Sequence, residues 1–537
     1  MTDLHANGNG ARHAKTLPAH EPESDEIVPI SPVDMRPLEP VKVSTPEEIA
    51  GAVARARTAQ QSWRVRSLDD RVGALQRAAK EMLRWRSEVM ALARAEMGKV
   101  DAEGLFNEAL GPLETVNGFA SVVAKATARR KPLLNPLSFP KKSAYVDLVP
   151  RGVVGVIAPW NYPVAGLYRS LMPALLTGNG VVLKPSEYTP RTSAWLAERL
   201  AAELPAGLIS VVQGPGRVGQ ALIDAGIDAC VFTGSPTSGR SVRLQCAERG
   251  IPCSVEMGGK DPAIVLADCD RPRTVAGLTH WALSNAGQSC GAIEIAFVDR
   301  AIADDMIARL AQAFRALKTG PGDFSALDVA PLANRRQLEI VSAQVEDARA
   351  KGAKIVCGGA AGEGLFYAPT LIDHCDESMS VVRDETFGPV LAVIRVDGAM
   401  EAVRRANALR YGLGASIWTK DVERAQRLAE RLDYGIVSVN NHSFTGAVAA
   451  LPWSGTRETG FGVANSEFSM STFVRPRAVV VDRSTAPELF WMPYDRTLLE
   501  LGDALADAQV MRFGRAWKVP LAMRERIATL KRYFGFR

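Results

Sequence analysis

The stretch Val153-Val154-Gly155-Val156-Ile157-Ala158-Pro159-Trp160-Asn161-Tyr162-Pro163 (residues 153–163) decides the fold. It begins with a short apolar run and ends abruptly in polar, aromatic and proline residues. A wholly apolar run of this length, rich in β-branched residues, is typical of a strand buried on both faces. We therefore predict a strand over residues 153–158, followed by a turn that presents polar groups at the strand's end.

Similar apolar runs recur at intervals of roughly 25 residues, with helical patterns between them. In the first half they lie at residues 180–184, 209–212 and 229–232. A second series lies at residues 263–266, 294–298, 390–396, 415–418 and 436–440. Strands that alternate with helices in this way predict an α/β protein built on parallel sheets.

Length and composition exclude several classes of protein. A chain of 537 residues with 47% hydrophobic and 23% charged residues predicts a soluble protein of two or three domains. We find no basic-then-apolar leader and no apolar run long enough to span a membrane. The seven cysteines have no regular spacing and include no CxxC pair, which favours a reducing cytoplasm over a disulfide framework. The six histidines are scattered, so we predict no metal site.

The start of the chain changes character near residue 45. Residues 1–40 are rich in Pro, Asn, His and acidic groups without periodicity, which predicts that they are mostly disordered. Thr45, Pro46 and the following glutamates then form a helix start, with Thr45 as the N-cap. Helical patterns continue to about residue 130.

Polar residues follow the strands of the first series, where doubly wound folds bind ligands. They include Pro159–Pro163, Lys184–Glu187 and the loop Thr233–Arg240. This last loop is rich in glycine and serine and leads into a helix, so its free amides suit a pyrophosphate.

Taken together, these stretches resemble the aldehyde dehydrogenase superfamily over about residues 27–483. The resemblance rests on APWNYP (158–163), LKPSE (183–187), FTGS (232–235), VEMGGKDP (255–262), NAGQSC (285–290), ETFGPV (385–390), YGLGASIWT (411–419) and PWSG (452–455). It implies NAD- or NADP-dependent oxidation of an aldehyde to an acid.

The same resemblance implies the domain organisation. A Rossmann-like NAD-binding domain would comprise residues 27–131 and 152–258, and an α/β catalytic domain residues 259–471. A β ribbon used in oligomerisation would come from residues 132–151 and 472–483. A disordered tail (1–26) and a basic extension (484–537) would lie outside these domains.

Three catalytic residues follow from the matched motifs. Cys290, set among small residues, would be the nucleophile that attacks the aldehyde and forms a thiohemiacetal. Asn161 would stabilise the developing oxyanion together with the Cys290 backbone N–H. Glu256 would be the general base that activates first the thiol and then water. The other six cysteines are interpreted as small core residues.

The cofactor residues also follow by resemblance. Lys184 and Glu187 would bind the adenosine ribose, and the Glu187 carboxylate would repel a 2′-phosphate, which favours NAD over NADP. Glu385 and Phe387 would hold the nicotinamide ribose and ring. The remaining positions expected near the cofactor are Trp160, Gly214, Gly234 and Ser235.

Some positions depart from the family. The second glutamate that often assists proton transfer in the family is replaced in this chain by Ala464. Trp453 stands where a phenylalanine is common. Arg169 stands where many relatives have an apolar residue lining the substrate tunnel, and it fits either a tunnel or a solvated helix face. The substrate is therefore left open.

Our prediction is a cytoplasmic, hydrolytic aldehyde dehydrogenase that forms a homodimer or homotetramer and binds no nucleic acid. The ribbon strand at residues 478–481 would pair with another subunit. One alternative is a CoA-acylating semialdehyde dehydrogenase, against which Glu256 argues. The other is a catalytically silent relative that acts as a binding protein, against which the joint presence of Cys290, Asn161 and Glu256 argues.

The net charge of +5 is concentrated in the C-terminal segment. Residues 512–537 contain eight Lys/Arg and one acidic residue, and without them the chain has 56 basic and 58 acidic residues. Pro520 could open a helix whose apolar face comprises Met523, Ile527, Leu530 and Phe534, with Arg524, Arg526, Lys531 and Arg532 around it. Three interpretations stay open: docking on the protein itself, peripheral contact with an anionic membrane, or disorder.

Overall fold

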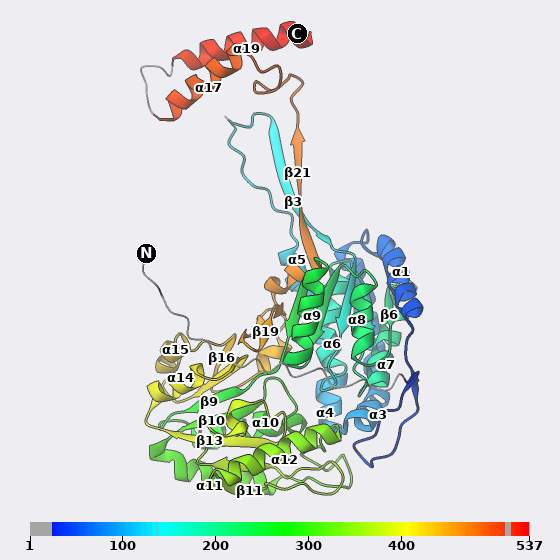
Figure 1. Cartoon of the computed structure of the whole chain (residues 1–537), viewed down its shortest axis with the longest axis vertical. Coiled ribbons are helices and arrows are strands. Elements are labelled where there is room, and N and C mark those ends of the chain that lie inside the picture. Colours follow the sequence, from blue (N-terminus) through cyan, green and yellow to red (C-terminus); the bar gives the residue numbers. More distant parts are fainter. Residues whose placement is uncertain (1–23, 137, 511–516, 536–537) are drawn as a thin grey trace, which may run out of the picture. The chain divides into compact units, whose positions relative to one another are not determined.

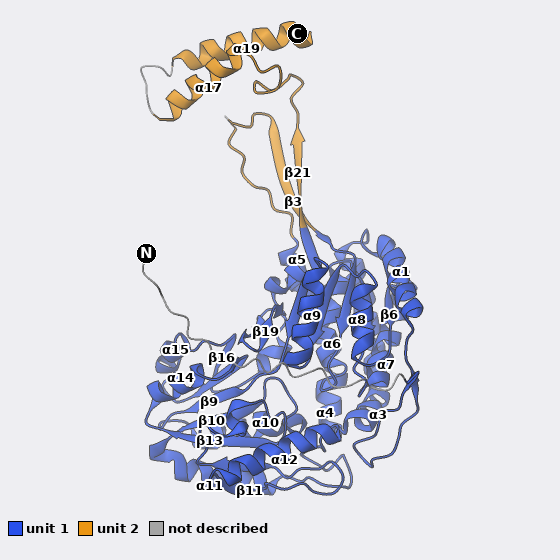
Figure 2. Ribbon diagram, in the orientation of Figure 1, with its two compact units in different colours: residues 1–127, 149–475 blue, residues 128–148, 476–537 orange. Residues whose placement is uncertain are grey.

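The computed structural model describes residues 24–136, 138–510 and 517–535. Contacts between residues divide the chain into two compact units, which are coloured separately in Figure 2. Unit 1 comprises residues 1–127 and 149–475, and unit 2 comprises residues 128–148 and 476–537. Both α/β series fall in unit 1, so the predicted boundary between residues 258 and 259 stays a prediction.

The N-terminal part of unit 1 is helical, as predicted. Helix α1 (Pro46–Trp63) begins at Thr45, whose hydroxyl accepts the Glu48 N–H while the Glu48 carboxylate accepts the Thr45 N–H. This reciprocal capping box satisfies two amides at the helix start. The helices that follow are α2 (Leu68–Arg84), α3 (Arg86–Met97), α4 (Asp101–Glu103), the π-helix η1 (Gly104–Ala109) and α5 (Gly111–Ala126).

The prediction of disorder to residue 40 is wrong for the described part of this segment. Strand β1 (Glu26–Ile27) pairs with β2 (Val41–Lys42), and Ile30 bridges to Pro37. Ser31 is buried and accepts the Met35 N–H through its backbone carbonyl. Composition suggested disorder, but contacts with sequence-distant residues order the segment. Residues 1–23, most of the predicted 1–26 tail, lie outside the described residues.

The first sheet of unit 1 has the strand order β19-β8-β7-β4-β5-β6. Four of its parallel strands match the predicted runs closely: β4 (Val153–Ile157), β5 (Gly180–Lys184), β6 (Ile209–Val211) and β7 (Ala229–Thr233). The fifth, β8 (Cys253–Glu256), was not among the predicted strands. Strand β19 (Gly460–Phe461) pairs antiparallel with β8. Helices α1, α8 (Gly216–Asp224) and α9 (Pro236–Glu248) share one apolar core with this sheet (Figure 1). Helices α6 (Ala165–Leu176) and α7 (Pro190–Ala201) make the other connections.

The second sheet has the order β11-β12-β13-β10-β9-β15-β16. The predicted strands are found as β9 (Asp261–Val265), β10 (Ile293–Asp299), β13 (Val390–Val396), β15 (Gly414–Trp418) and β16 (Ile436–Val439). The edge adds β11 (Lys354–Cys357), which is antiparallel, and β12 (Thr370–Asp373). Its core also takes side chains from α10 (Arg271–Leu283), α11 (Ala303–Ala316), α12 (Arg335–Ala350), α14 (Ala399–Asn407) and α15 (Val422–Ala429). The chain is thus the predicted α/β protein, with two sheets that are parallel except for β19 and β11 at their edges.

Unit 2 contains most of a two-stranded ribbon, β3 (Lys142–Pro150) with β21 (Val474–Asp482), as predicted. Lys142 Nζ lies 3.0 Å from Asp482 Oδ2, and Arg129 donates to Asp147 at 2.7 Å. Val480 and Val481 are exposed on β21. Pairing with another subunit there stays a prediction. No helix of the described residues is long and apolar enough to cross a membrane.

The C-terminal segment forms a helical hairpin within unit 2. Helix α17 (Arg496–Gln509) packs on α19 (Lys518–Phe534) through Leu501, Ala504 and Ala522. The predicted helix is confirmed, and disorder is wrong for these residues. The predicted apolar face is split, because Leu530 is buried whereas Met523, Ile527 and Phe534 are exposed.

The expectation that Arg526 belongs to the solvated part of this helix is wrong. Its side chain is fully buried and donates to Asp495 Oδ1 at 3.0 Å and to the Leu489 carbonyl at 2.7 Å. Docking of the hairpin on the catalytic domain stays a prediction.

Candidate functional site

The carboxyl edge of the first sheet gathers most of the residues predicted to bind a cofactor. Strands β4 and β5 are in register at Ile157 and Lys184, and β7 and β8 at Thr233 and Glu256. The segments that follow these strands therefore meet at one edge. The predicted residues found on them are Trp160, Asn161, Lys184, Glu187, Gly214, Gly234, Ser235 and Glu256.

The strand order reverses at β4, because the chain proceeds to β5 on one side and later to β7 on the other. Open parallel sheets bind ligands at such a switch point. The loop after β7 contributes Gly234 there, where an added Cβ would lie 2.7 Å from the Phe232 ring. Ser235 caps α9 by accepting the Ser238 N–H at 3.3 Å. The start of α9 at this edge fits an anionic group.

Lys184 and Glu187 lie beside each other after β5, with 3.4 Å between Lys184 Nζ and Glu187 Oε2. Lys184 is buried, whereas the Glu187 side chain is 39% exposed. The carboxylate is thus accessible to a ligand at the sheet edge while its charge is balanced by the neighbouring lysine.

Trp160 and Phe387 connect the two sheets of unit 1. Their rings meet edge to face with centroids 5.4 Å apart. Phe387 has φ +52°, and its N–H and that of Thr386 donate to the Glu294 carboxylate at 2.9 and 2.8 Å. The same carboxylate pairs with buried Lys260. A left-handed phenylalanine is costly, and these bonds hold it in place.

Glu385 lies against the Gly258-Gly259 turn, and its Oε1 accepts the Gly259 N–H at 3.0 Å. A Cβ on Gly258 would lie 2.1 Å from this carboxylate, and a Cβ on Gly259 would lie 2.5 Å from the Cys290 carbonyl oxygen. The two glycines therefore allow Glu385 and the cysteine loop to approach one backbone turn. Burial, reinforced by Glu294, raises the pKa of Glu385 to about 8.

The loop before Cys290 has an unusual backbone. Asn285, Ala286 and Gly287 have φ values of +54°, +53° and +71°. A Cβ on Gly287 would lie 2.0 Å from the Gly388 carbonyl oxygen, so only glycine fits there. Left-handed residues cost free energy, which the surrounding contacts must offset.

Side-chain hydrogen bonds hold this loop against the segment after β4. Asn285 Nδ2 donates to the carbonyls of Asn161 and Gln288 at 3.1 and 3.0 Å, and Asn161 Nδ2 donates to the Gln288 carbonyl at 3.1 Å. Lys99 Nζ donates to Asn285 Oδ1 at 2.9 Å and lies 3.1 Å from Glu108. The Asn161 amide is therefore placed beside the cysteine loop by a buried network.

Cys290 is partly buried and packs with Leu413, Ile436 and Trp453. Burial raises the pKa of its thiol to about 12, which the Arg169 cation opposes and the Glu256 carboxylate reinforces. At Gly291 an added Cβ would lie 2.2 Å from Ser443 Oγ, so the cysteine loop contacts Ser443 at the position that has no side chain. The thiol is poorly ionised here and needs a base.

Glu256 ends β8, and its Oε2 lies 3.9 Å from Arg169 Nη2. Burial raises the pKa of Glu256, and Arg169 opposes this shift. Arg169 also lies over the Trp453 ring, 4.7 Å from its centroid. Of the two interpretations of Arg169, the solvated helix face is wrong, because its side chain is only 21% exposed. Ala464 pairs with Trp453 across β17 (Trp453–Ser454) and β20 (Val463–Ala464), so that position carries no carboxylate.

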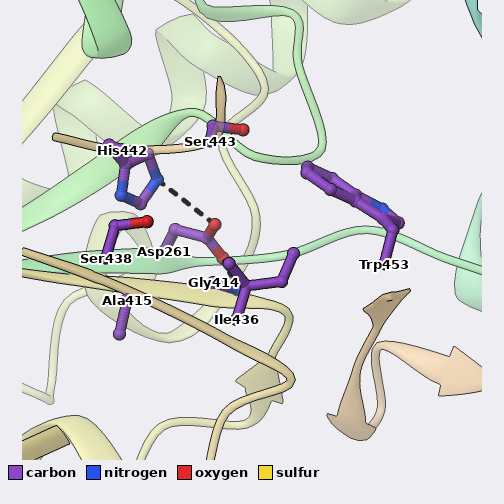
Figure 3. Close-up of a pocket in the computed structure, with 8 residues that line it drawn as sticks. All are labelled: Asp261, Gly414, Ala415, Ile436, Ser438, His442, Ser443 and Trp453. Carbon is purple, nitrogen blue, oxygen red and sulfur yellow. Dashed lines mark hydrogen bonds and ion pairs between the residues drawn. The ribbon is translucent and has the colours of Figure 1, made fainter. Parts of the chain in front are cut away.

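Lys99 and the pair formed by His442 and Asp261 are buried ionisable groups near the site that sequence reasoning missed. Lys99 gave no signal because an isolated lysine normally faces solvent. The second group is the pair His442–Asp261, with 3.3 Å between Nε2 and Oδ2, in a pocket bordered by Trp453 (Figure 3). His442 lies in the loop of residues 441–450. The only sequence signal for this site is that the loop's composition differs from that usual in the family.

Comparisons with known proteins agree with this geometry. The family described as the aldehyde dehydrogenase family matches residues 20–479. A 4,4′-diapolycopene aldehyde oxidase of Methylomonas sp is 35% identical over 470 residues, which cover 87% of this chain and 88% of the relative. A Mycolicibacterium smegmatis protein, provisionally named an NADP(+) succinate-semialdehyde dehydrogenase, is 34% identical, with 83% and 87% covered.

Solved structures give the same result. The aldehyde dehydrogenase of Mycobacterium tuberculosis complexed with NAD+ has a TM-score of 0.80 at 31% identity, with 86% of this chain and 96% of that chain covered. An NAD+ complex of the Bacillus cereus aldehyde dehydrogenase has a TM-score of 0.81 at 28% identity, with 86% and 94% covered. The names of these proteins include both NAD and NADP, so they leave the choice between the two cofactors open.

Proposed function

This chain belongs to the aldehyde dehydrogenase family and is an oxidoreductase acting on aldehydes, and from that premise we propose that it converts an aldehyde, NAD and water into a carboxylic acid and NADH. The observation that supports this proposal most is the contact between the loop that precedes Cys290 and the segment that contains Asn161. The cysteine loop is hydrogen bonded to the Asn161 segment, which follows β4, and Glu256 ends β8, two strands away in the same sheet.

Cys290 is the proposed nucleophile. Because burial raises its pKa to about 12, the thiol must lose its proton to a base as it attacks the carbonyl carbon. Glu256 takes that proton, and its own raised pKa makes it a stronger base than an exposed carboxylate. The new S–C bond leaves an alkoxide, which the Asn161 Nδ2 and the Cys290 N–H would stabilise.

Loss of a hydride from this carbon leaves a thioester on Cys290. Glu256, having released the thiol proton to solvent, then deprotonates water, which attacks the thioester carbonyl. The C–S bond breaks to release the acid, and the leaving thiolate takes the proton from Glu256 to regenerate the thiol. With Ala464 in place of a second carboxylate, Glu256 acts alone in our proposal.

The residues at the sheet edge fit a nicotinamide dinucleotide, which supplies the hydride acceptor when bound. Lys184 and Glu187 offer a donor and an exposed acceptor for ribose hydroxyls, and the α9 start suits the pyrophosphate. Glu385, Phe387 and Trp160 would border the nicotinamide half of the cofactor. At Gly214 and Gly234 the cofactor could approach the protein backbone closely. We propose NAD because the Glu187 carboxylate would repel a 2′-phosphate.

The substitution Glu187→Ser tests this preference. Removing the carboxylate removes its repulsion, so the ratio of kcat/KM with NADP to kcat/KM with NAD should rise about tenfold or more. Glu198→Ser, on the next helix, is the matched control and should leave the ratio unchanged. An unmoved ratio in Glu187→Ser would place the discrimination elsewhere.

Two alternative functions and the oligomeric state are also proposals. Transfer of the acyl group to CoA would not need the base that Glu256 provides, and a silent relative would not need the Cys290, Asn161 and Glu256 arrangement. Absence of a CoA requirement in the assay would separate hydrolysis from the first rival. We also propose that the ribbon formed by β3 and β21 pairs subunits into a homodimer or homotetramer.

A carboxylate-bearing aldehyde is the substrate class that Arg169 favours. Its Nη2 is buried and makes no hydrogen bond among the described residues, although it lies near Glu256. A guanidinium so placed can accept a second carboxylate by a charge-assisted bond. Succinate semialdehyde, named in several relatives, has such a group.

We therefore expect the wild type to prefer succinate semialdehyde over butanal, and Arg169→Met to lower kcat/KM for succinate semialdehyde about 10- to 100-fold more than for butanal. The reduced nicotinamide is followed by absorbance. An equal fall for both aldehydes would mean that Arg169 acts on Cys290 and Glu256 and not on the substrate.

A further inference from the structure

The C-terminal hairpin of unit 2 exposes many large apolar side chains. Between residues 489 and 495, the side chains of Phe490, Trp491, Met492 and Tyr494 are 63%, 52%, 63% and 72% exposed. Four such side chains so close together are unusual, because exposed apolar residues on soluble proteins are mostly isolated. This loop therefore presents an aromatic surface that needs a partner.

Buried Arg526 fixes this loop to α19. Its guanidinium donates to the carbonyls of Leu489 and Trp491 and to the Asp495 carboxylate, which also caps α17. The charge and the carbonyls are satisfied within the hairpin, while the aromatic residues of the loop are exposed to solvent. The exposed aromatics thus belong to a held loop.

Helix α19 adds a second strip of the same kind. Met523, Ile527 and Phe534 are exposed, and their spacing of i, i+4 and i+11 places them on one face. Arg524 and Lys531, seven residues apart, border this strip and are exposed. Exposed apolar side chains therefore alternate with cations along α19.

The charges of the hairpin are divided between its two helices. Helix α19 contains five Lys/Arg and one acidic residue, Glu525, whereas α17 contains Glu500, Asp503 and Asp507 against Arg496. One of the five cations, Arg526, is consumed by its ion pair with Asp495. The outer surface of α19 is consequently cationic, and α17 would face away from an anionic partner.

We propose that the 489–495 loop and the outer face of α19 lie on an anionic lipid bilayer. Tryptophan and tyrosine favour the interface between headgroups and acyl chains, and lysine and arginine contact the lipid phosphates. A helix that rests on the surface needs no long apolar span. The proposal does not rest on the proposed catalytic function.

The test is co-sedimentation of the full-length protein with vesicles of phosphatidylcholine alone and of phosphatidylcholine with phosphatidylserine. Binding to the phosphatidylserine vesicles is expected, and it should weaken as salt is added. Each cation near such a surface contributes about fivefold, so Arg524→Gln/Lys531→Gln should lower the partition coefficient about 25-fold. Met523→Ser/Ile527→Ser/Phe534→Ser should remove most of the remaining affinity.

Leu244→Ser/Met400→Ser is the matched control, because it replaces two exposed apolar residues on different helices of unit 1, and it should bind like the wild type. Unchanged far-UV circular dichroism of every variant excludes misfolding. No binding of the wild type to phosphatidylserine vesicles, or undiminished binding of both hairpin variants, would overturn the proposal. In another outcome the wild type does not bind vesicles, and the hairpin variants differ from it in molar mass by light scattering. That result would show that the exposed face of the hairpin is a subunit interface and not a membrane-binding surface.

Discussion

Replacing Cys290 with alanine is expected to reduce aldehyde oxidation by on the order of 10⁴-fold or more, because the covalent adduct can no longer form. Binding of NAD should change little, since the proposed cofactor residues come mainly from the first sheet and from residues 385–387. Steady-state formation of reduced nicotinamide measures the first quantity, and titration calorimetry with NAD measures the second.

Cys357→Ala provides the matched control. Cys357 is also partly exposed, but it lies on the edge strand β11, where the Pro369 carbonyl is its neighbour. This variant should keep wild-type turnover. Substantial turnover by Cys290→Ala would remove the basis for the proposed chemistry.

The second large effect is expected for Glu256→Gln. Without the carboxylate, water attacks the thioester slowly, so steady-state turnover should fall about 10²- to 10⁴-fold. The burst of reduced nicotinamide should slow as well, because Glu256 also takes the thiol proton. It should still precede the steady state, because a thiol loses its proton to solvent more readily than water does. Stopped-flow absorbance separates the burst from the steady state.

The pH dependence gives an independent check on Glu256. A base must be deprotonated to act, and burial raises the pKa of Glu256. Deacylation by the wild type should therefore increase as the pH rises through that elevated pKa and fall below it, whereas Glu256→Gln should lose this dependence. A variant with unchanged burst, steady state and pH profile would require a different base.

Much of the fold was predictable because its signals are local. Buried parallel strands are short apolar runs, and β5 and β13 have the predicted limits. The Thr45 N-cap was likewise predictable, because the cap and the amide that it accepts lie within one helical turn. The motif residues at the ends of these strands then came together because parallel strands share one carboxyl edge.

Other features were not predictable because their partners are far away in the sequence. Arg526 looks like one of several solvated cations of α19, yet it is buried by carbonyls more than 30 residues earlier. Residues 26–27 look disordered until they pair with β2. Lys99 is buried because Asn285, almost 200 residues later, accepts its hydrogen bond. Long-range polar contacts of this kind leave no periodic pattern.

The most direct test of the central claim is to locate the covalent intermediate. Glu256→Gln protein mixed with an aldehyde and NAD is quenched in acid, digested and measured by peptide mass spectrometry. We predict an acyl mass on the peptide that contains Cys290, present only when NAD is included, since hydride loss must precede the thioester. Absence of the acyl mass where a burst of reduced nicotinamide is seen, or its presence on another cysteine, would contradict the account.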